Sequence, residues 1–165
     1  MLRPFLILFT ALIATSASML AQATVRIEAV NLQGSRPLQE QTRSAAIRDY
    51  LQSWQSLTAA LEQNRADLLE PGFVGSAKDT LAATIQQQTA LGISTHYQDR
   101  KHDLQLVFYS PEGLSIELTD NVEYDVQLLD HGRVKTVQRV SARYVIVLTP
   151  AEVRWRVRVF QGTPR

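Results

Sequence analysis

Asp120 is a carboxylate that falls on the apolar register of a long alternating segment, where it could act as a general acid or base. Between residues 114 and 128, apolar side chains occupy most even positions: Leu114, Ile116, Leu118, Val122, Tyr124, Val126 and Leu128. Successive strand side chains point to opposite faces, so the pattern predicts one long strand with Asp120 on its buried face. Burial raises the pKa of a carboxyl group toward the range useful for proton transfer. Thr119-Asp120-Asn121 is also typical of a β-bulge, which we favour, but Asp120 remains the best catalytic candidate.

Six aromatic side chains could line a pocket between the predicted sheet and the helices that cover it. They are Trp54, Tyr97, Phe108, Tyr124, Tyr144 and Trp155, all on predicted inward faces. We expect most of them simply to form the core. The tyrosine hydroxyl groups need partners when buried, so a subset could surround a small apolar ligand together with a few polar groups.

Arginines alternate with apolar residues on the predicted outer face of the last strand. Arg154, Arg156 and Arg158 would lie there beside Val145 and Val147 of the preceding strand. Arginine stems over exposed valines form an amphipathic surface that a protein partner could cover. The alternative is a solvated face whose arginines are neutralised by acidic side chains of the neighbouring strand.

Residues 1–23 have the features of a secretory signal peptide. Arg3 precedes an apolar run from Phe5 to Ile13, and Ala21-Gln22-Ala23 has the small-x-small pattern of a cleavage site. The run is too short to span a bilayer, so we expect cleavage near Ala23 and a secreted or periplasmic protein without a stable membrane anchor. Removal of Arg3 leaves 16 of the 17 basic residues against 16 acidic ones. This balance argues against a nucleic-acid partner.

The sequence predicts neither a metal site nor a bound cofactor. It contains no cysteine, which excludes disulfides, thiol catalysis and thiolate ligands. We place His96 on an outward register and His102 and His131 in turns, without metal-ligand spacing. Glycine-rich phosphate loops, serine-histidine-acid order and metalloprotease helices are also missing from the sequence.

Helical patterns occupy the first half of the chain. Residues 24–36 form an arm that is either a short edge strand or unordered, and Ser35 could cap the helix that follows. Apolar residues at i, i+3 and i+4 spacing predict this helix over 38–63. A short helix over 64–70 and a third one from Ser76 to Leu91 complete the helical part.

After Gly92 the sequence predicts antiparallel strands joined by turns at 99–102, 110–113, 130–132 and 149–152. Pairing around these turns sets Tyr97 opposite Leu104, Glu123 opposite Arg139, Trp155 opposite Ile146 and Val157 opposite Tyr144. The agreement of these registers on one buried face predicts an α+β domain over 37–165. Its N-terminal helices would pack on a curved antiparallel sheet of four to five strands.

This pattern resembles the nuclear transport factor 2-like superfamily, whose cystatin-like fold is a cone of helices on a curved sheet. The resemblance rests on Tyr50-Leu51-x-x-Trp54, on Asp67-Leu68-Leu69 with Phe73, on 142–148 and on Arg154-Trp155-Arg156-Val157. It covers roughly residues 37–162. The superfamily includes SnoaL-like and ketosteroid isomerase-like enzymes as well as scaffolds, so the resemblance implies a fold more than a function.

Two catalytic positions of the ketosteroid isomerase-like members have counterparts here. Tyr50 matches the first-helix tyrosine that donates to an oxyanion, and Asp120 matches the acid of the sheet. The base position fails, because the segment after the second helix offers only Glu70. The resemblance also implies a homodimer through the outer sheet face.

These observations lead to three functional hypotheses. The first is an exported, non-catalytic domain that binds a small apolar ligand or a protein partner. The second is an isomerase, cyclase or dehydratase that uses Asp120 with Tyr50. The third is a periplasmic, secretion-system-like scaffold that self-associates through the arginine and valine surface.

Overall fold

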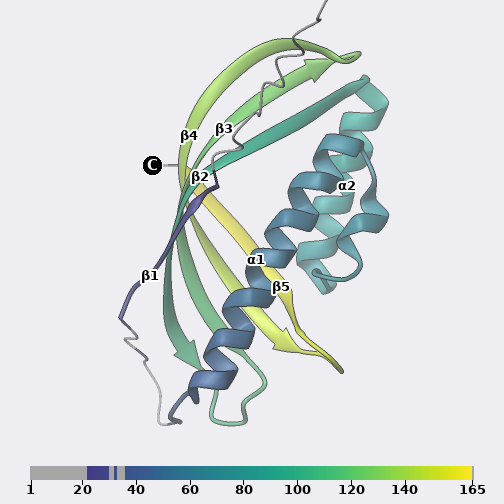
Figure 1. Ribbon diagram of the computed structural model, residues 1–165. Coiled ribbons are helices and arrows are strands. Elements are labelled where there is room, and N and C mark those ends of the chain that lie inside the picture. Colours follow the sequence, from purple (N-terminus) through teal and green to yellow (C-terminus); the bar gives the residue numbers. More distant parts are fainter. Residues whose placement is uncertain (1–21, 30–31, 33–35, 165) are drawn as a thin grey trace, which may run out of the picture.

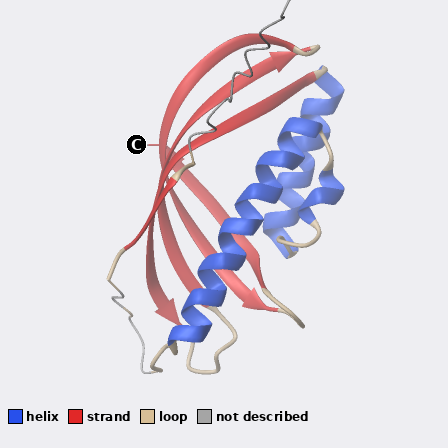
Figure 2. Cartoon of the chain, viewed as in Figure 1, coloured by secondary structure: helices blue, strands red, loops and turns tan. Residues whose placement is uncertain are grey.

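The computed structural model describes residues 22–29, 32 and 36–164, in which helices cover one face of a curved five-stranded sheet (Figures 1 and 2). In chain order, the elements are β1 (Thr24–Ile27), α1 (Glu40–Gln63), the 3-10 helix η1 (Ala66–Leu69), α2 (Gly75–Leu91), β2 (Ile93–Tyr109), β3 (Ile116–Asp130), β4 (Arg133–Pro150) and β5 (Trp155–Pro164). The strands lie side by side in the order β1-β2-β3-β4-β5. This arrangement confirms the predicted α+β cone. The sheet is mixed, because β1 runs parallel to β2 while the other neighbours are antiparallel.

Helix α1 crosses the concave face of the sheet and buries the stripe that its sequence predicts. Ile47, Tyr50, Trp54, Leu57 and Leu61 recur at helical spacing and are all buried. The helix ends at Asn64, whose left-handed backbone (φ 53°) lets its N–H bond to the Ala60 carbonyl. Its N-cap is Gln39, without a side-chain cap, and the predicted cap Ser35 lies outside the described residues.

The second predicted helix shortens to the single 3-10 turn η1, and the third is α2. Gly92 ends α2 in the left-handed region (φ 67°), and its N–H bonds back to the Gln88 and Thr89 carbonyls. Between η1 and α2 the chain touches the last strand, since Phe73 forms a bridge with Val157. This bridge connects the helical layer to β5 at the edge of the sheet.

Strand β2 is continuous, so the predicted turn at residues 99–102 is wrong. A β-bulge lies there instead: Asp99 pairs with Tyr124, Lys101 pairs with Glu123, and Arg100 is the extra residue. Tyr97 accordingly pairs with Val126 and Leu104 with Asp120. The four consecutive polar residues 99–102 suggested a turn, but in the structure they lie in a strand that contains one additional residue.

Strand β3 shows no register shift at Asp120, so the predicted bulge over 119–121 is also wrong. Asp120 pairs regularly with Leu104 on one side and Tyr144 on the other. The turns at 110–113 and 130–132 are confirmed by the breaks between β2, β3 and β4. Asp125, and not Glu123, lies opposite Arg139.

The last hairpin is displaced from its predicted register. Strand β4 continues to Pro150, so the turn occupies residues 151–154 and pairing begins between Pro150 and Trp155. Val157 therefore lies opposite Leu148, and Phe160 instead of Trp155 lies opposite Ile146. A further shift between Val147 and Leu148 adds to this displacement.

The core lies between the helices and the concave face, and it contains residues of α1, α2, β2, β3, β4 and β5. None of the helices in the described ranges is long and apolar enough to cross a membrane.

Candidate functional site: a buried histidine between two carboxylates

A chain of hydrogen bonds joins α1 to the middle of the sheet. The Tyr50 hydroxyl donates to Asp120 Oδ2 over 2.7 Å, and His102 Nδ1 lies 2.6 Å from the same oxygen. Tyr50 is 1% exposed, Asp120 0% and His102 2%. The three side chains come from α1, β3 and β2, so the network forms only when the helix is docked on the sheet.

The bulge in β2 brings a second carboxylate to His102. Residues three apart in a regular strand point to opposite faces, but the additional residue Arg100 turns both Asp99 and His102 toward α1. Asp99 Oδ2 accepts a hydrogen bond from Trp54 Nε1 over 3.0 Å and lies 4.0 Å from His102 Nε2. His102 is thus placed between Asp120 and Asp99.

This placement favours the protonated imidazole. Burial lowers the pKa of His102, but the hydrogen bond to Asp120 and the neighbouring Asp99 outweigh it and raise the pKa to about 9. The pKa of the Tyr50 hydroxyl is raised well above its usual value, first by burial and then by the charge of Asp120. At neutral pH Tyr50 therefore donates a proton to the network, and His102 carries a positive charge.

Two carboxylate oxygens of this cluster lack a hydrogen-bond donor in the part of the chain that the structure describes. Asp99 Oδ1 and Asp120 Oδ1 are buried and have no hydrogen-bond partner among the described residues. Asp99 belongs to the wall of a pocket, whereas Asp120 is completely enclosed. A buried acceptor without a donor is costly, so these two oxygens lower the stability that the cluster contributes.

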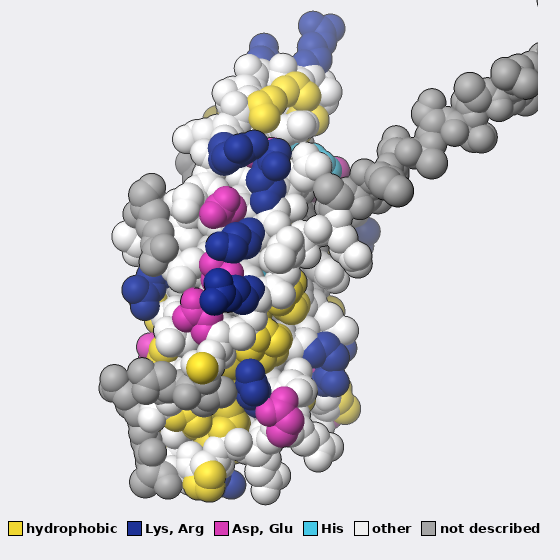
Figure 3. Space-filling model, turned by 60° about the vertical axis from the view of Figure 1, so that its left-hand side comes forward, with side chains coloured by type: hydrophobic (Ala, Val, Ile, Leu, Met, Phe, Trp, Pro, Cys, Tyr) yellow, Lys and Arg dark blue, Asp and Glu magenta, His cyan; other side chains and the backbone are white. Residues whose placement is uncertain are grey.

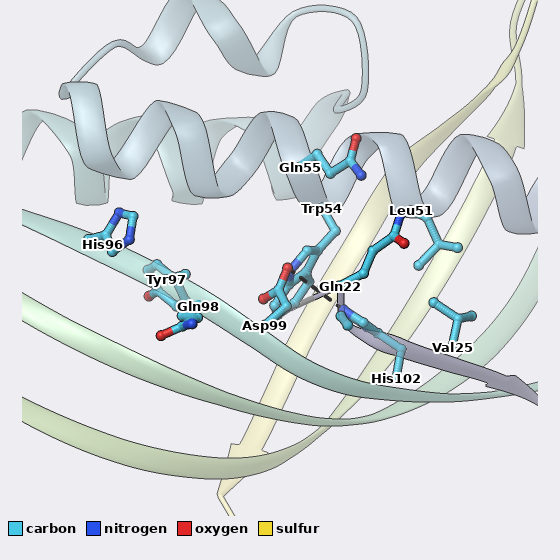
Figure 4. A pocket seen from close by; sticks show the side chains of 11 residues that line it. Gln22, Val25, Leu51, Trp54, Gln55, His96, Tyr97, Gln98, Asp99 and His102 are labelled. Carbon is cyan, nitrogen blue, oxygen red and sulfur yellow. Dashed lines mark hydrogen bonds and ion pairs between the residues drawn. The ribbon is translucent and has the colours of Figure 1, made fainter. Parts of the chain in front are cut away.

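An open pocket of about 760 Å³ lies between α1, β2 and the N-terminal arm. Figure 4 shows the α1 side chains Leu51 and Trp54 on one side of it and the β2 side chains Asp99 and His102 on the other, and Gln55 of α1 also lines it. The remaining lining residues are Gln22, Ala23, Val25, His96, Tyr97 and Gln98. A volume of this size suits a small organic ligand.

The interior of the cone is filled more tightly. A cavity of about 130 Å³ lies among α1, α2, Tyr144 and Phe160, and Trp54 and Tyr97 line both this cavity and the pocket. Rings pack around Trp54, with the centroid of Tyr144 at 5.4 Å and that of Tyr124 at 6.0 Å. The cavity is too small for a drug-sized ligand, so of these two spaces the pocket on the His102 side of Trp54 is the one that could hold it.

The structure brings the two predicted catalytic residues together but does not expose them. Tyr50 donates to Asp120, which also contacts His102, and neither Tyr50 nor Asp120 lines the pocket or the cavity. In this conformation they can reach a bound molecule only through His102. Their catalytic roles stay a prediction.

The six predicted pocket residues occupy five different environments. Trp54 and Tyr97 line the pocket, and Tyr144 lines the cavity. The Tyr124 hydroxyl lies 3.3 Å from that of Tyr144 in the core.

Phe108 and Trp155 depart from the expected inward position. A second bulge in β2, between Leu106 and Phe108, turns Tyr109 inward and places Phe108 in a hollow with Glu117, Thr119, Arg143 and Val145. Trp155 packs at the edge of the core, where its backbone N–H donates to Asp49 Oδ2 over 2.8 Å.

The predicted arginine and valine surface is not one patch. Arg154 borders a hollow on the helical side with Gln52 and Asp67, and Arg156 donates to the Glu70 and Phe73 carbonyls. Val145 remains on the outer face of the sheet. Arg154 belongs to the turn before β5, and Arg156 can bend toward the helices because β5 is an edge strand. A homodimer through the outer face stays a prediction, without Arg154 and Arg156.

The face turned away from the helices carries a row of alternating charges (Figure 3). Asp125 pairs with Arg100 and with Arg139 Nε at 3.1 Å, and Lys101 Nζ lies 2.6 Å from Asp103. The guanidinium groups lower the pKa of Asp125. The basic and acidic side chains of this row therefore neutralise one another at the surface.

Sequence reasoning missed His102 and Asp99, although a signal for them exists. Inward positions are odd in Ile93, Thr95 and Tyr97 but even in Leu104 and Leu106. This change of parity indicates one additional residue between them, and a bulge supplies it as well as a turn does. His131, by contrast, lies in the turn where it was predicted.

Comparison with solved structures supports the fold. No protein-family model matches the sequence, and no curated protein is significantly similar to it. The intermembrane-space region of the chloroplast protein ARC6 superposes with a TM-score of 0.59 at 14% identity, over 79% of this chain and 100% of that one. A putative scytalone dehydratase from Novosphingobium aromaticivorans gives 0.54 at 10% identity, over 77% and 89%.

A putative dehydratase of the NTF2-like family from Streptomyces avermitilis gives a TM-score of 0.50 at 9% identity, over 74% of this chain and 98% of that one. The chain is therefore a domain with the nuclear transport factor 2-like fold. At these identities the likeness defines the fold alone.

Proposed function

We propose that this chain is an exported, non-catalytic domain that binds a small ligand in the pocket between α1, β1 and β2. The observation that carries the proposal is the pocket itself, with Trp54 and Tyr97 as an apolar wall and Asp99 and His102 as polar groups. An apolar wall with a few placed polar groups is the usual composition of a small-molecule site. Export is supported by the leader-like features of residues 1–23.

Export and ligand binding are linked through the N-terminal arm. Gln22 and Ala23 line the pocket, and the predicted cleavage near Ala23 would remove them. Binding should therefore be measured on protein whose N-terminus has been determined by mass spectrometry. We expect this N-terminus to be Thr24 after secretion from a host with a general export pathway.

A thermal-shift screen tests ligand binding without assuming any chemistry. A molecule that binds the folded state stabilises it by mass action, so we expect members of an aromatic and alicyclic library to raise the melting temperature. Gln55→Tyr, which adds bulk inside the pocket, should abolish the shift. Gln52→Tyr is the matched control, because Gln52 is exposed on the same helix and does not line this pocket.

Fluorescence locates the binding site independently. The chain has two tryptophans, and Trp155 lies away from the pocket, so Trp155→Phe leaves Trp54 as the single reporter. A hit from the screen should change the Trp54 emission in this variant. Stabilisation without any change in Trp54 emission, or equal loss in the Gln55 and Gln52 variants, would contradict the proposed site.

The second candidate function is acid-base catalysis of the dehydratase or isomerase type. It is favoured by the placement of a charged His102 at the pocket with Asp99 beside it and Asp120 behind it. His102 would donate a proton to a leaving hydroxyl group, and Asp99 would accept one from carbon. Two of the structural neighbours carry dehydratase names.

Mass spectrometry separates this candidate from simple binding. Each stabilising ligand is incubated with the protein, and loss of the mass of water or conversion to an isomer of different retention time is recorded. Catalysis predicts conversion by the wild type and none by His102→Gln. Recovery of every ligand unchanged would support the non-catalytic proposal.

A further inference from the structure

The charged cluster beside the pocket identifies a class of ligand; the inference rests on the proposed function. Two carboxyl groups, Asp99 and Asp120, flank the single imidazole of His102, and of the two only Asp99 lines the pocket. The described residues that line the pocket include no lysine or arginine, and His96, which also lines it, pairs with Glu62. The nearest basic side chains on β2, Arg100 and Lys101, pair with Asp125 and Asp103 on the opposite face.

Asp99 brings this acidic cluster to the pocket. Asp120 is completely buried, and its Oδ2 already accepts from Tyr50 and contacts His102. The Asp99 side chain is 23% exposed at the pocket wall, where its Oδ2 accepts from Trp54 Nε1. An ammonium group in the pocket could therefore reach Asp99 and form a charge-assisted hydrogen bond with it.

The walls beside Asp99 suit the rest of such a molecule. Trp54 and Tyr97 line the pocket, and an aromatic face attracts a cation as well as an apolar group. The bond from Trp54 Nε1 to Asp99 fixes the indole ring next to the carboxylate. We propose that the pocket selects ligands with a protonated amine on an apolar body, and that the Asp99 carboxylate accepts a hydrogen bond from the ammonium group.

A matched series of three compounds tests this selectivity. Phenylethylamine, phenylethanol and phenylpropionate share a ring and a short chain but differ in charge. We expect the amine to bind the wild-type protein about ten- to hundredfold more tightly than the alcohol, the range that a hydrogen bond to a charged group supplies. The carboxylate should bind most weakly. Calorimetry or Trp54 emission gives the affinities.

Asp99→Asn assigns the effect to the carboxylate. Asparagine keeps an oxygen for Trp54 Nε1 and removes the charge, so the amine should lose its advantage while the alcohol keeps its affinity. Asp103→Asn is the control, because Asp103 pairs with Lys101 on the other face of the same strand. If the Asp99 variant does not fold, the comparison of the three compounds on the wild-type protein still tests the inference.

The outcomes separate the inference from the proposed function. Equal binding of amine and alcohol would overturn the amine assignment and leave the pocket as a binding site. Preference for the carboxylate would overturn it in favour of recognition by His102. No binding by any member, together with no hit in the library screen, would contradict the proposed function itself.

Discussion

Strands β2 and β3 carry ion pairs on both faces, but the pair under α1 is removed from water while those on the opposite face are solvated. His102 and Asp120 meet at 2.6 Å with side-chain exposures of 3% and 0%. Arg139 and Asp125 meet at 3.1 Å with exposures of 66% and 15%. Removing one member of the buried pair leaves the other as a buried charge without a partner. At the surface, water replaces the lost partner. Ion pairs with similar contact distances can therefore differ in their contribution to the free energy of unfolding.

We expect the largest loss of stability when the buried carboxylate is removed. Asp120→Ala leaves protonated His102 and the Tyr50 hydroxyl without their shared acceptor, and we expect a loss of about 3–5 kcal/mol in the free energy of unfolding. Urea denaturation followed by circular dichroism measures it. A loss below about 1 kcal/mol would place the buried pair in the same class as the surface pairs.

The pH dependence of stability should report on His102 alone. Its pKa of about 9 in the folded protein exceeds the unfolded value near 6.5, so its contribution is complete below pH 6.5 and disappears as pH rises toward 9. The loss is on the order of 3 kcal/mol. Urea midpoints across this range measure it, and His102→Gln should lack this decrease. An equal decrease in that variant would assign it to other groups.

Tyr50→Phe should have a smaller effect. The substitution removes the hydroxyl donor, but Asp120 Oδ2 keeps its contact with His102, so we expect a loss of about 1.5–3 kcal/mol. The same urea experiment measures it. A phenylalanine variant as stable as the wild type would show that the hydroxyl does not stabilise the ionised carboxylate.

The smallest effect is expected on the outer face. Asp125→Ala removes the partner of Arg100 and Arg139, and we expect a change of about 0–1 kcal/mol that shrinks further with added salt. Denaturation at low and high ionic strength tests both statements. A loss as large as that of Asp120→Ala would remove the distinction between the two faces.

The sequence predicted the elements well where one periodicity ran without interruption. The 3.6-residue spacing from Ile47 to Leu61 and the alternation of β3 each define a buried face, and both were located correctly. Glycine or proline punctuated the chain where it did change direction, as at Gly92 and Gly132.

The site could be predicted only in part, because it depends on bulges and long-range register. Tyr50 and Asp120 were identified by their faces, but their partner His102 was assigned to a turn that does not exist. A bulge is a one-residue event that propensity cannot separate from a turn in a polar run such as Asp99 to His102. Arg154 was misplaced because the turn occupies residues 151–154, and Arg156 because an edge strand lets a long side chain leave its own face.

A nuclear magnetic resonance titration of the His102 ring tests the central claim, that a charged histidine lies between Asp120 and Asp99 at the pocket. The claim predicts a pKa near 9 for His102 and a clear decrease in Asp120→Asn. A His102 pKa at or below 6.5, unchanged in that variant, would contradict it.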